Sequence, residues 1–312
     1  MGASDKRRIV LVSRKTRLQE LTERFNTWPQ AKFYLEHNHV DAVDYLREHD
    51  VYMQQLLEAE RILKRHARFQ PLERSYLPDY RFSAEDIVVV VGQDGLVANT
   101  LKYLQGQPVI AVNPDPRRWE GRLLPFVLAD LAHVVARTCE GKSHGKSITF
   151  AEARTNDGQR LLGVNDLFIG PKSHTSARYA LQWRGQQEEQ SSSGIIVSTG
   201  FGSSGWFKSV LAGAIGVTRG VTGQQDHPLA NGFEWQAKKL YFTVREPFPS
   251  RNSGARLVFG EIGGEDNLRL ESHMPENGVV FSDGIESDFL AFNSGTVLTV
   301  GVAAECGQLI VH

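Results

Sequence analysis

The stretch that decides the fold is Ile87-Val88-Val89-Val90-Val91-Gly92-Gln93-Asp94-Gly95, an apolar run followed by two glycines that bracket an acid. Five apolar residues before a glycine are typical of a buried strand in a parallel sheet, with a tight turn at its carboxyl end. Ligands of open α/β sheets bind at that edge. Glycines let backbone N–H groups approach phosphate oxygens, and Asp94 could accept a proton from a hydroxyl or orient a magnesium ion. The stretch indicates phosphoryl transfer, although an isolated turn of this kind is as often a simple strand end.

Composition narrows the class of protein. The 312 residues are 41% hydrophobic and 23% charged, which is ordinary for a globular protein with room for two cores. A formal net charge of -1 gives no global field that favours nucleic acid or an anionic membrane, so we expect neither as a partner. Cys139 and Cys306 lie far apart and indicate neither a disulfide framework nor a zinc site, and we assign no metal ligands. We expect a soluble cytoplasmic protein.

Residues 1–126 show the alternation of strand and helix that is typical of a parallel, Rossmann-like sheet. Apolar runs predict strands at Ile9–Ser13, Ile87–Val91 and Val109–Asn113. Helices are expected at Thr16–Arg24, over about 30–63 and at Ala98–Leu104. In the longest helical stretch apolar residues recur at three-, four- and seven-residue steps, so we expect one face to pack on the sheet. The sequence predicts an N-terminal α/β nucleotide-binding domain.

From residue 127 the pattern changes to one helix, at about 127–138, and then to short β-type segments separated by glycine and serine. These segments are Ser147–Glu152, Leu161–Ile169, Ala177–Trp183, Gly194–Thr199, Lys239–Val244, Ala255–Phe259, Leu268–Ser272, Val279–Phe281 and Val297–Val302. They predict an antiparallel β-sandwich, the substrate-binding domain, over 127–290, with a C-terminal segment, 291–312, that could return to the first domain. The polar stretches Gln186–Ser193 and Gly220–Pro228 are expected to be surface loops.

Two further turns have the composition of a ligand site. Asn113-Pro114-Asp115-Pro116 ends the strand after the first glycine turn, so both turns should lie on the same edge of the sheet. Gly200-Phe201-Gly202-Ser203-Ser204-Gly205 matches G-x-G-x-x-G, but the second strand with a terminal acid that a dinucleotide fold needs is missing. This turn precedes a helix expected at Trp206–Ala214, so it is either an anion or ribose cradle or an ordinary N-capped helix.

Taken in order, these segments resemble the NAD kinase family, within the diacylglycerol-kinase-like superfamily, and most closely its mitochondrial type. Over about residues 85–300, Gly92–Leu96 is similar to the family's Gly-Gly-Asp-Gly-Thr turn, and Val112–Pro116 with Glu120-Gly121 is similar to its Gly-Val-Asn-x-Asp-Pro stretch. Asn165-Asp166, together with Ser176–Tyr179, is similar to a family segment that begins with an Asn-Glu pair. Ser198–Trp206 is similar to the family's Thr-Gly-Thr-Gly-Ser-x-x-Trp segment. Arg245-Glu246-Pro247 and Asp283-Gly284 complete the order of motifs.

The resemblance implies a magnesium-dependent kinase that transfers the γ-phosphate of ATP to the adenosine 2′-hydroxyl of NAD, and a homo-oligomer with the sandwich domain at the contact. It implies that Asp94 is the catalytic base. The implied phosphate- and nucleotide-binding residues are Gly92, Gln93, Gly95, Asn113, Asp115, Thr199, Gly200, Gly202, Ser203 and Ser204. The implied substrate-binding residues are Asn165, Asp166, Arg178, Asp283 and Gly284.

Several positions depart from the family pattern. Gln93 replaces a glycine, Leu96 replaces a threonine whose hydroxyl could help to hold phosphate, and Asp166 replaces a glutamate. Phe201 stands where a small hydroxylated residue is expected. These departures keep two alternatives open. One is a kinase of the same fold that acts on another hydroxyl compound, such as a sugar, nucleoside or lipid alcohol, and the other is a non-catalytic nucleotide-binding protein.

Overall fold

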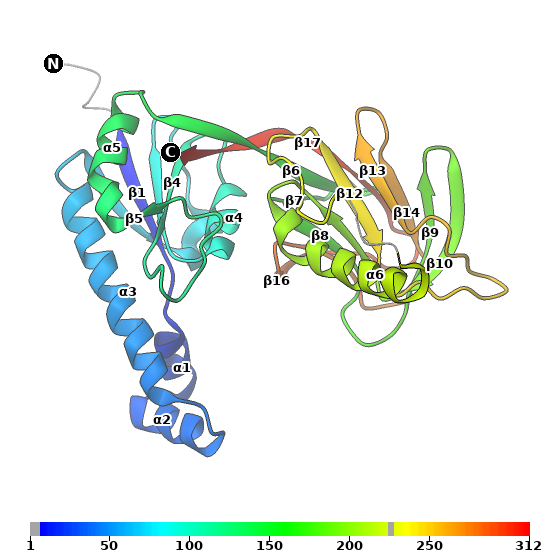
Figure 1. Ribbon diagram of the computed structural model, residues 1–312, viewed down its shortest axis with the longest axis horizontal. Helices are drawn as coiled ribbons and strands as arrows, with labels where there is room; N and C mark the ends of the chain where they lie inside the picture. Colours follow the sequence, from blue (N-terminus) through cyan, green and yellow to red (C-terminus); the bar gives the residue numbers. More distant parts are fainter. Residues whose placement is uncertain (1–6, 224–227) are drawn as a thin grey trace. The chain divides into compact units, whose positions relative to one another are not determined.

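The computed structural model describes residues 7–223 and 228–312. These residues form two compact units, one within Met1–Lys146 plus Gln308–His312 and the other within Ser147–Gly307 (Figure 1). Each unit has its own apolar core.

The first unit is built on a parallel sheet. Its strands follow the order β2 (Arg68–Glu73), β1 (Arg8–Ser13), β3 (Ile87–Val91) and β4 (Pro108–Asn113). The short strand β5 (Phe126–Val127) and the end of β17 (Val297–Val311) also pair with β4 in parallel. Every residue of β3 is buried, as expected for a central strand covered on both faces.

Among the described residues, the helices that accompany this sheet are α1 (Arg17–Phe25), α2 (Trp28–His37), α3 (Ala42–Leu63), α4 (Asp94–Leu101) and α5 (Leu131–Cys139). Short 3-10 turns span Arg74–Asp79 and Leu128–Asp130. Local capping fixes the helix starts, because Thr16 forms a capping box with Gln19 and the Asp41 carboxylate accepts the Val43 N–H at 2.8 Å. The core joins β1, β3 and β4 to the inner faces of α3 and α5, including Tyr52 and Leu131.

The three strands predicted for this unit are confirmed, whereas β2 was missed. Only Leu72 of β2 is buried, and Pro71 is tolerated because β2 is an edge strand. The helical stretch expected over about 30–63 is two helices, because the chain turns at His39, which has a φ of +57°.

The second unit is a sandwich of two sheets. One is an antiparallel six-stranded sheet in the order β13 (Phe259–Gly263), β12 (Lys239–Val244), β11 (Ile195–Ser198), β8 (Asp166–Pro171), β15 (Gly278–Ser282) and β16 (Ile285–Ala291). The other contains β10 (Gln186–Ser192), β9 (Ala177–Trp183), β14 (Leu268–Ser272), β17, β6 (His144–Thr155) and β7 (Arg160–Gly163). Side chains of both sheets meet in one core, which includes Tyr179, Phe242 and Phe292. The predicted fold class, α/β plus an antiparallel β-sandwich, is confirmed.

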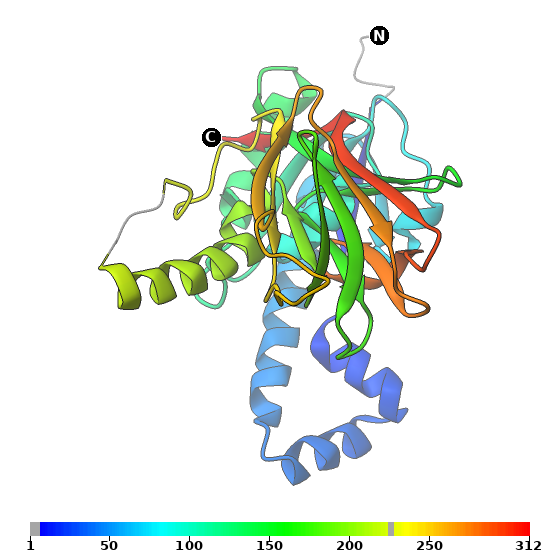
Figure 2. The same cartoon turned by 90° about the vertical axis from the view of Figure 1, so that its right-hand side faces the viewer.

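Helix α6 (Trp206–Thr222) lies on the outer face of the six-stranded sheet (Figure 2). It follows the 3-10 turn Gly202–Ser204 and packs Phe207 and Leu211 against Tyr241. The helix continues beyond the predicted end at Ala214.

Three predictions for this unit were wrong. Gln186–Ser193 is not a loop but contains β10, which pairs with β9 through a turn in which Arg184 and Gly185 both have positive φ. The loop expected at Gly220–Pro228 is wrong at its start because α6 runs to Thr222, and residues 224–227 lie outside the described part of the chain. A strand begins at Phe259 rather than spanning Ala255–Phe259.

Candidate functional site

The carboxyl edge of the parallel sheet brings three chain segments together. β1, β3 and β4 are neighbours in parallel register, so their ends and the turns that follow them share this edge. The Gly92 N–H donates to the Val112 carbonyl at 3.3 Å, which fixes the glycine turn beside the end of β4. Asp94 is the first residue of α4, and no side chain caps this helix. The first turn of α4 is therefore suited to an anion, because helix N-termini carry unpaired N–H groups and a partial positive charge.

Asp94 is held in a defined position at the start of this helix. Its Oδ1 accepts the Leu123 N–H at 3.0 Å, and its side chain is partly buried. Burial raises the pKa of Asp94 above its usual value, against the opposing effect of the backbone N–H donors of Leu123 and Arg122. A carboxylate with a raised pKa is a stronger base, which suits a group that must accept a proton from a hydroxyl.

The loop after β4 supplies the N–H group that holds Asp94. Asn113 shapes this loop, since its Nδ2 donates to the Trp119 carbonyl and its Oδ1 accepts the Asp115 N–H, both at 3.0 Å. Gly121 has a φ of +61°, and a Cβ at this position would overlap the Asn113 amide. Asn113 and Asp115, which the resemblance placed among the nucleotide ligands, build the loop in the structure.

Gln93 occupies the turn where the family pattern has a glycine. With the amide oriented to satisfy both donors, its oxygen accepts from Trp119 Nε1 at 3.0 Å and from Arg14 at 3.1 Å. Arg14, which directly follows β1, also donates to Glu48 of α3 at 3.0 Å. The Gln93 side chain therefore joins the glycine turn to the ends of two other segments. Neighbouring Leu96 is buried within α4 and offers no hydroxyl.

A charged cluster supports this edge from the side of α3. Glu48 is 2% exposed and forms ion pairs with Arg14, Arg17 and Arg118. Asp44 pairs with Arg118 and Arg17, and these arginines hold the pKa of Asp44 far below its usual range. A buried carboxylate is tolerated only when it is paired in this way. Sequence reasoning missed the cluster, although Arg14 was detectable as the residue after a predicted strand end.

In the second unit, the other glycine-rich turn is packed against protein backbone. The Thr199 hydroxyl donates to the Val164 carbonyl at 2.6 Å and accepts the Gly202 N–H at 3.1 Å. A Cβ on Gly202 would overlap the Asn165 carbonyl, and one on Gly200 would overlap the Glu234 carbonyl. The Ser203 hydroxyl donates to the Gly200 carbonyl at 2.7 Å. These residues hold the turn itself, which leaves Ser204, partly buried at its end, without such a role.

Asn165 and Asp166 lie beside this turn and beside the carboxylate of Asp283. The Asp283 Oδ1 accepts the N–H groups of Val164 at 3.0 Å, Asn165 at 2.6 Å and Asp166 at 3.4 Å. Burial, together with the Asp283 charge, raises the pKa of Asp166 to about 7. The Asn165 Oδ1 is buried and has no hydrogen-bond partner in the structure. These two residues thus combine a buried acceptor that has no partner with a buried carboxyl whose pKa is about 7.

The remaining predicted substrate residues differ in their placement. Gly284 follows Asp283 in the turn between β15 and β16, and both have positive φ. Arg178 lies on β9 in the other sheet, with an exposed side chain. The described contacts do not join its side chain to Asn165 or Asp166. The structure brings Thr199, Asn165, Asp166 and Asp283 together, and no described contact joins Arg178 to this group.

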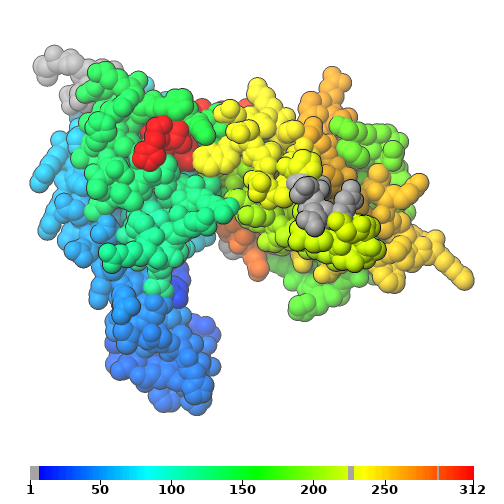
Figure 3. All heavy atoms as spheres, viewed as in Figure 1, coloured from blue at the N-terminus to red at the C-terminus, as the bar shows by residue number. Residues whose placement is uncertain are grey.

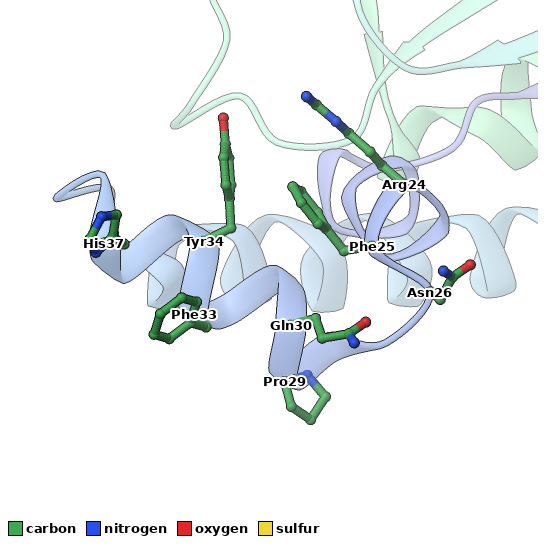
Figure 4. A pocket seen from close by; sticks show the side chains of 8 residues that line it. All are labelled: Arg24, Phe25, Asn26, Pro29, Gln30, Phe33, Tyr34 and His37. Atoms are coloured by element: carbon green, nitrogen blue, oxygen red, sulfur yellow. The ribbon is translucent and has the colours of Figure 1, made fainter.

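Further cavities lie away from these residues. One, of about 680 Å³, lies at α1 and α2 and is lined by Arg24, Phe25, Asn26, Pro29, Gln30, Phe33, Tyr34 and His37 (Figure 4). It holds no carboxylate, and His37 is the candidate base among its lining residues. Another, of about 1130 Å³, lies between α6 and the end of β12. Within 7–223 and 228–312, no group of three or more His, Cys, Asp or Glu side chains is arranged to bind a metal, and no helix is long and apolar enough to cross a membrane.

Comparison with known proteins shows which solved structures share this fold. No protein-family model matches the sequence, and no curated protein matches it. Among solved structures, yeast NADH kinase complexed with NADH is similar, with a TM-score of 0.58 and 13% sequence identity over 98% of this chain and 83% of that one. An NAD kinase from Archaeoglobus fulgidus in complex with ATP is similar with a TM-score of 0.56 and 14% identity over 97% and 92% of the two chains. The chain has the two-domain α/β and β-sandwich architecture of these kinases. More narrowly, this is the NAD kinase fold, which the motifs had implied.

Proposed function

We propose that this protein belongs to the NAD kinase family and transfers the γ-phosphate of ATP to the adenosine 2′-hydroxyl of NAD, giving NADP and ADP. The observation that carries the proposal is the position of Asp94, between Gly92 and Gly95 at the first turn of α4, with its carboxylate fixed by the Leu123 N–H at 3.0 Å. The likeness in fold to an NADH kinase that binds NADH and an NAD kinase that binds ATP supports the same assignment.

In this proposal the first turn of α4 receives the phosphate groups through its unpaired N–H groups, as helix N-termini do in other phosphate sites. Asp94 accepts the proton of the attacking hydroxyl. A bond forms between that oxygen and the γ-phosphorus while the bond to the β,γ-bridging oxygen breaks, and ADP leaves. Positioning and charge stabilisation supply most of the acceleration in such a transfer, and the protein makes no covalent bond.

Asn165 and Asp166 are the residues we propose for the acceptor nucleotide. The buried Asn165 Oδ1 lacks a partner, so it can accept from an amide, amino or hydroxyl group of the ligand. The pKa of Asp166, about 7, lets its carboxyl donate when protonated and accept when ionised. Asn165 and Asp166 can therefore form hydrogen bonds with both hydroxyl and carbonyl groups of a dinucleotide.

The side chains of this protein could bind Mg²⁺ only together with the phosphate groups of the nucleotide. No cluster of three metal-binding side chains occurs among the residues described, and Mg²⁺ commonly uses one or two carboxylates together with substrate phosphates. Asp94 is the carboxylate that would hold it, with Glu120 near enough to influence the charge of Asp94. The ion would neutralise negative charge on the phosphate being transferred.

A second candidate is a kinase of the same fold that phosphorylates another hydroxyl compound. The bonds from Gln93 to Trp119 and Arg14 favour it, because they place a fixed side chain at the turn where the family pattern has only hydrogen. That side chain reduces the space beside Asp94 and would alter which phosphate or acceptor fits there.

An acceptor panel with γ-labelled ATP separates these functions. NAD, NADH, nucleosides, sugars and diacylglycerol are each offered to the wild type, to Asp94→Asn and to the control Asp79→Asn, whose carboxylate is exposed in a 3-10 turn. We expect labelled NADP from the wild type and the control, and a rate lower by roughly a thousandfold in Asp94→Asn with unchanged thermal unfolding.

Label in another acceptor alone would identify the second candidate. NAD binding measured by calorimetry, with no ATP consumption in any mixture, would identify a non-catalytic nucleotide-binding protein. Near-wild-type turnover in Asp94→Asn would overturn the assignment of the base.

A further inference from the structure

The turn between β15 and β16 is anchored beside the start of β8. Ser282 pairs with Ile285, which leaves a turn of two residues. These residues, Asp283 and Gly284, both have positive φ, and an Asp-Gly pair is a favoured sequence for such a hairpin turn. The Asp283 N–H donates to the Asp166 carbonyl at 3.1 Å, which joins the turn to β8. Gly284 is exposed, and orange-red residues of this hairpin are visible at the surface in the space-filling view (Figure 3).

The Asp283 side chain holds the backbone of the residues that we assign to the acceptor nucleotide. Its Oδ1 accepts the N–H groups of Val164, Asn165 and Asp166. The Asn165 carbonyl accepts the Thr199 N–H at 2.9 Å. Both main-chain groups of Asn165 are therefore bonded within the protein, whereas its buried Oδ1 has no partner among the described residues. This arrangement fixes the position of Asn165 and leaves Oδ1 for a ligand.

The same carboxylate places a charge against Asp166. Three N–H donors stabilise the ionised form of Asp283. Asp166 is 7% exposed, and neither a hydrogen bond nor an ion pair joins its carboxyl to another described residue. Neighbouring carboxyls in a poorly hydrated site do not readily ionise together, and burial with the Asp283 charge accordingly raises the pKa of Asp166 to about 7. Of the neighbouring segments, Ser198–Gly205 has no charged side chain, and Glu286 beyond the turn is exposed.

We propose that Asp283 is a positioning residue of the acceptor site, which fixes Asn165 as a hydrogen-bond acceptor and, through its negative charge, keeps the Asp166 carboxyl available as a hydrogen-bond donor. This inference rests on the proposed function, because it takes Asn165 and Asp166 as the residues that bind the acceptor nucleotide. It changes the implied role of Asp283 from a substrate contact to a group that acts through its neighbours. The site then suits a ligand edge that carries a donor beside an acceptor, as amide and amino-heterocycle groups do.

The pH dependence of binding follows from this role. Ionisation of Asp166 removes the donor and puts a second negative charge in the site, so the observed Kd varies inversely with the protonated fraction. In the wild type this fraction falls from nearly all at pH 5 to about half at pH 7. Without the Asp283 charge, Asp166 ionises at lower pH. A shift of about one pH unit leaves about a tenth protonated at pH 7, which weakens binding about fivefold there and little at pH 5.

Three variants separate the charge of Asp283 from its geometry. Asp283→Asn keeps an acceptor oxygen and a residue that tolerates positive φ, but removes the charge. Asp283→Gly keeps the backbone of the turn and removes the whole side chain. Glu286→Gln, which removes an exposed negative charge close to the same turn, is the matched control. Thermal unfolding confirms that each variant is folded.

NMR of protein labelled with ¹³C at the aspartate carboxyl carbons follows Asp166 without any ligand. The signal that is missing from Asp166→Asn identifies Asp166. We expect it to titrate near pH 7 in the wild type and in Glu286→Gln, and about one pH unit lower in Asp283→Asn. The same titration in the wild type and Asp283→Asn, or an equal shift in Glu286→Gln, would overturn the effect of the Asp283 charge.

Hydrogen exchange tests the positioning of the backbone. The Val164–Asp166 amides should exchange faster in Asp283→Gly than in Asp283→Asn, because only the glycine variant lacks an acceptor for them. Unchanged exchange in Asp283→Gly would overturn this part of the proposal.

Calorimetry of NAD binding at pH 5 and pH 7 tests the consequence for the ligand. We expect Asp283→Asn to bind NAD like the wild type at pH 5 and about fivefold more weakly at pH 7. Equal weakening at both pH values would show a purely structural role and overturn the proposal. If the wild type binds no NAD at either pH, the proposed function fails, whereas the carboxyl titration still decides the role of Asp283.

Discussion

The buried carboxyl of Asp166 should make the stability of this protein fall as pH rises. Burial and the charge of Asp283 raise the pKa of Asp166 from 3.8 to about 7 in the folded state. The unfolded chain releases this proton near pH 4, whereas the folded protein keeps it up to about pH 7. The unfolded state therefore binds fewer protons across this window, and the free energy of unfolding declines with pH from about 4 to about 7 and is constant above it.

The size of this effect follows from the two pKa values. At 1.36 kcal/mol for each unit, the difference corresponds to about 4 kcal/mol in total, of which about 3 kcal/mol develops between pH 5 and pH 8. Asp166→Asn keeps the shape of the side chain but removes its titration. The wild type should therefore lose about 3 kcal/mol of unfolding free energy between pH 5 and pH 8 that Asp166→Asn does not lose.

Urea unfolding at pH 5 and pH 8 measures this difference directly. Glu265→Gln, an exposed carboxylate in a turn of the same unit, is the control and should follow the wild type at both values. If Asp166→Asn and the wild type change in parallel between the two pH values, Asp166 does not keep its proton in the folded protein and the reasoning is refuted.

Three structural substitutions give further expectations. Tyr52→Phe should lower the free energy of unfolding by about 1–3 kcal/mol. The Tyr52 hydroxyl accepts the Arg14 N–H at 3.0 Å and donates to the Val91 carbonyl at 2.9 Å, so it joins the ends of β1 and β3. An unchanged midpoint in urea titrations would contradict this expectation. Gly121→Ala should lower the free energy of unfolding by about 1–3 kcal/mol, because Gly121 has a positive φ and an added Cβ would overlap Asn113. If this loop positions the Asp94 carboxylate, the variant should also reduce kcat more than it changes KM. Full activity would contradict that positioning role. Gly202→Ala should destabilise the second unit by about 1–3 kcal/mol or more, since its Cβ would overlap the Asn165 carbonyl, and a wild-type thermal midpoint would show that the turn can move instead.

Much of the fold was predictable because hydrophobic patterning is a local property. The continuous apolar run of β3 predicted a central parallel strand, and the regularly spaced short segments after residue 127 predicted the sandwich. Prediction failed where local preference was outweighed by tertiary contacts. The polar strand β10 forms because it pairs with β9 and buries Glu188 and Gln190, which no apolar alternation could reveal. Edge strand β2 was not predicted for the same reason, because it forms through hydrogen bonds to its partner β1.

The sequence by itself determined the glycine turn, the acid within it and the order of motifs, because strand ends and turns depend on neighbouring residues. Only the tertiary structure decided what surrounds that acid. The Leu123 N–H and the bonds from Gln93 to Arg14 and Trp119 join residues between 26 and 79 positions apart. Asp283, whose charge helps to raise the pKa of Asp166, lies 117 positions from it. The protonation of a carboxyl depends on the solvent and charges packed around it, and these are set by the folded arrangement rather than by adjacent residues.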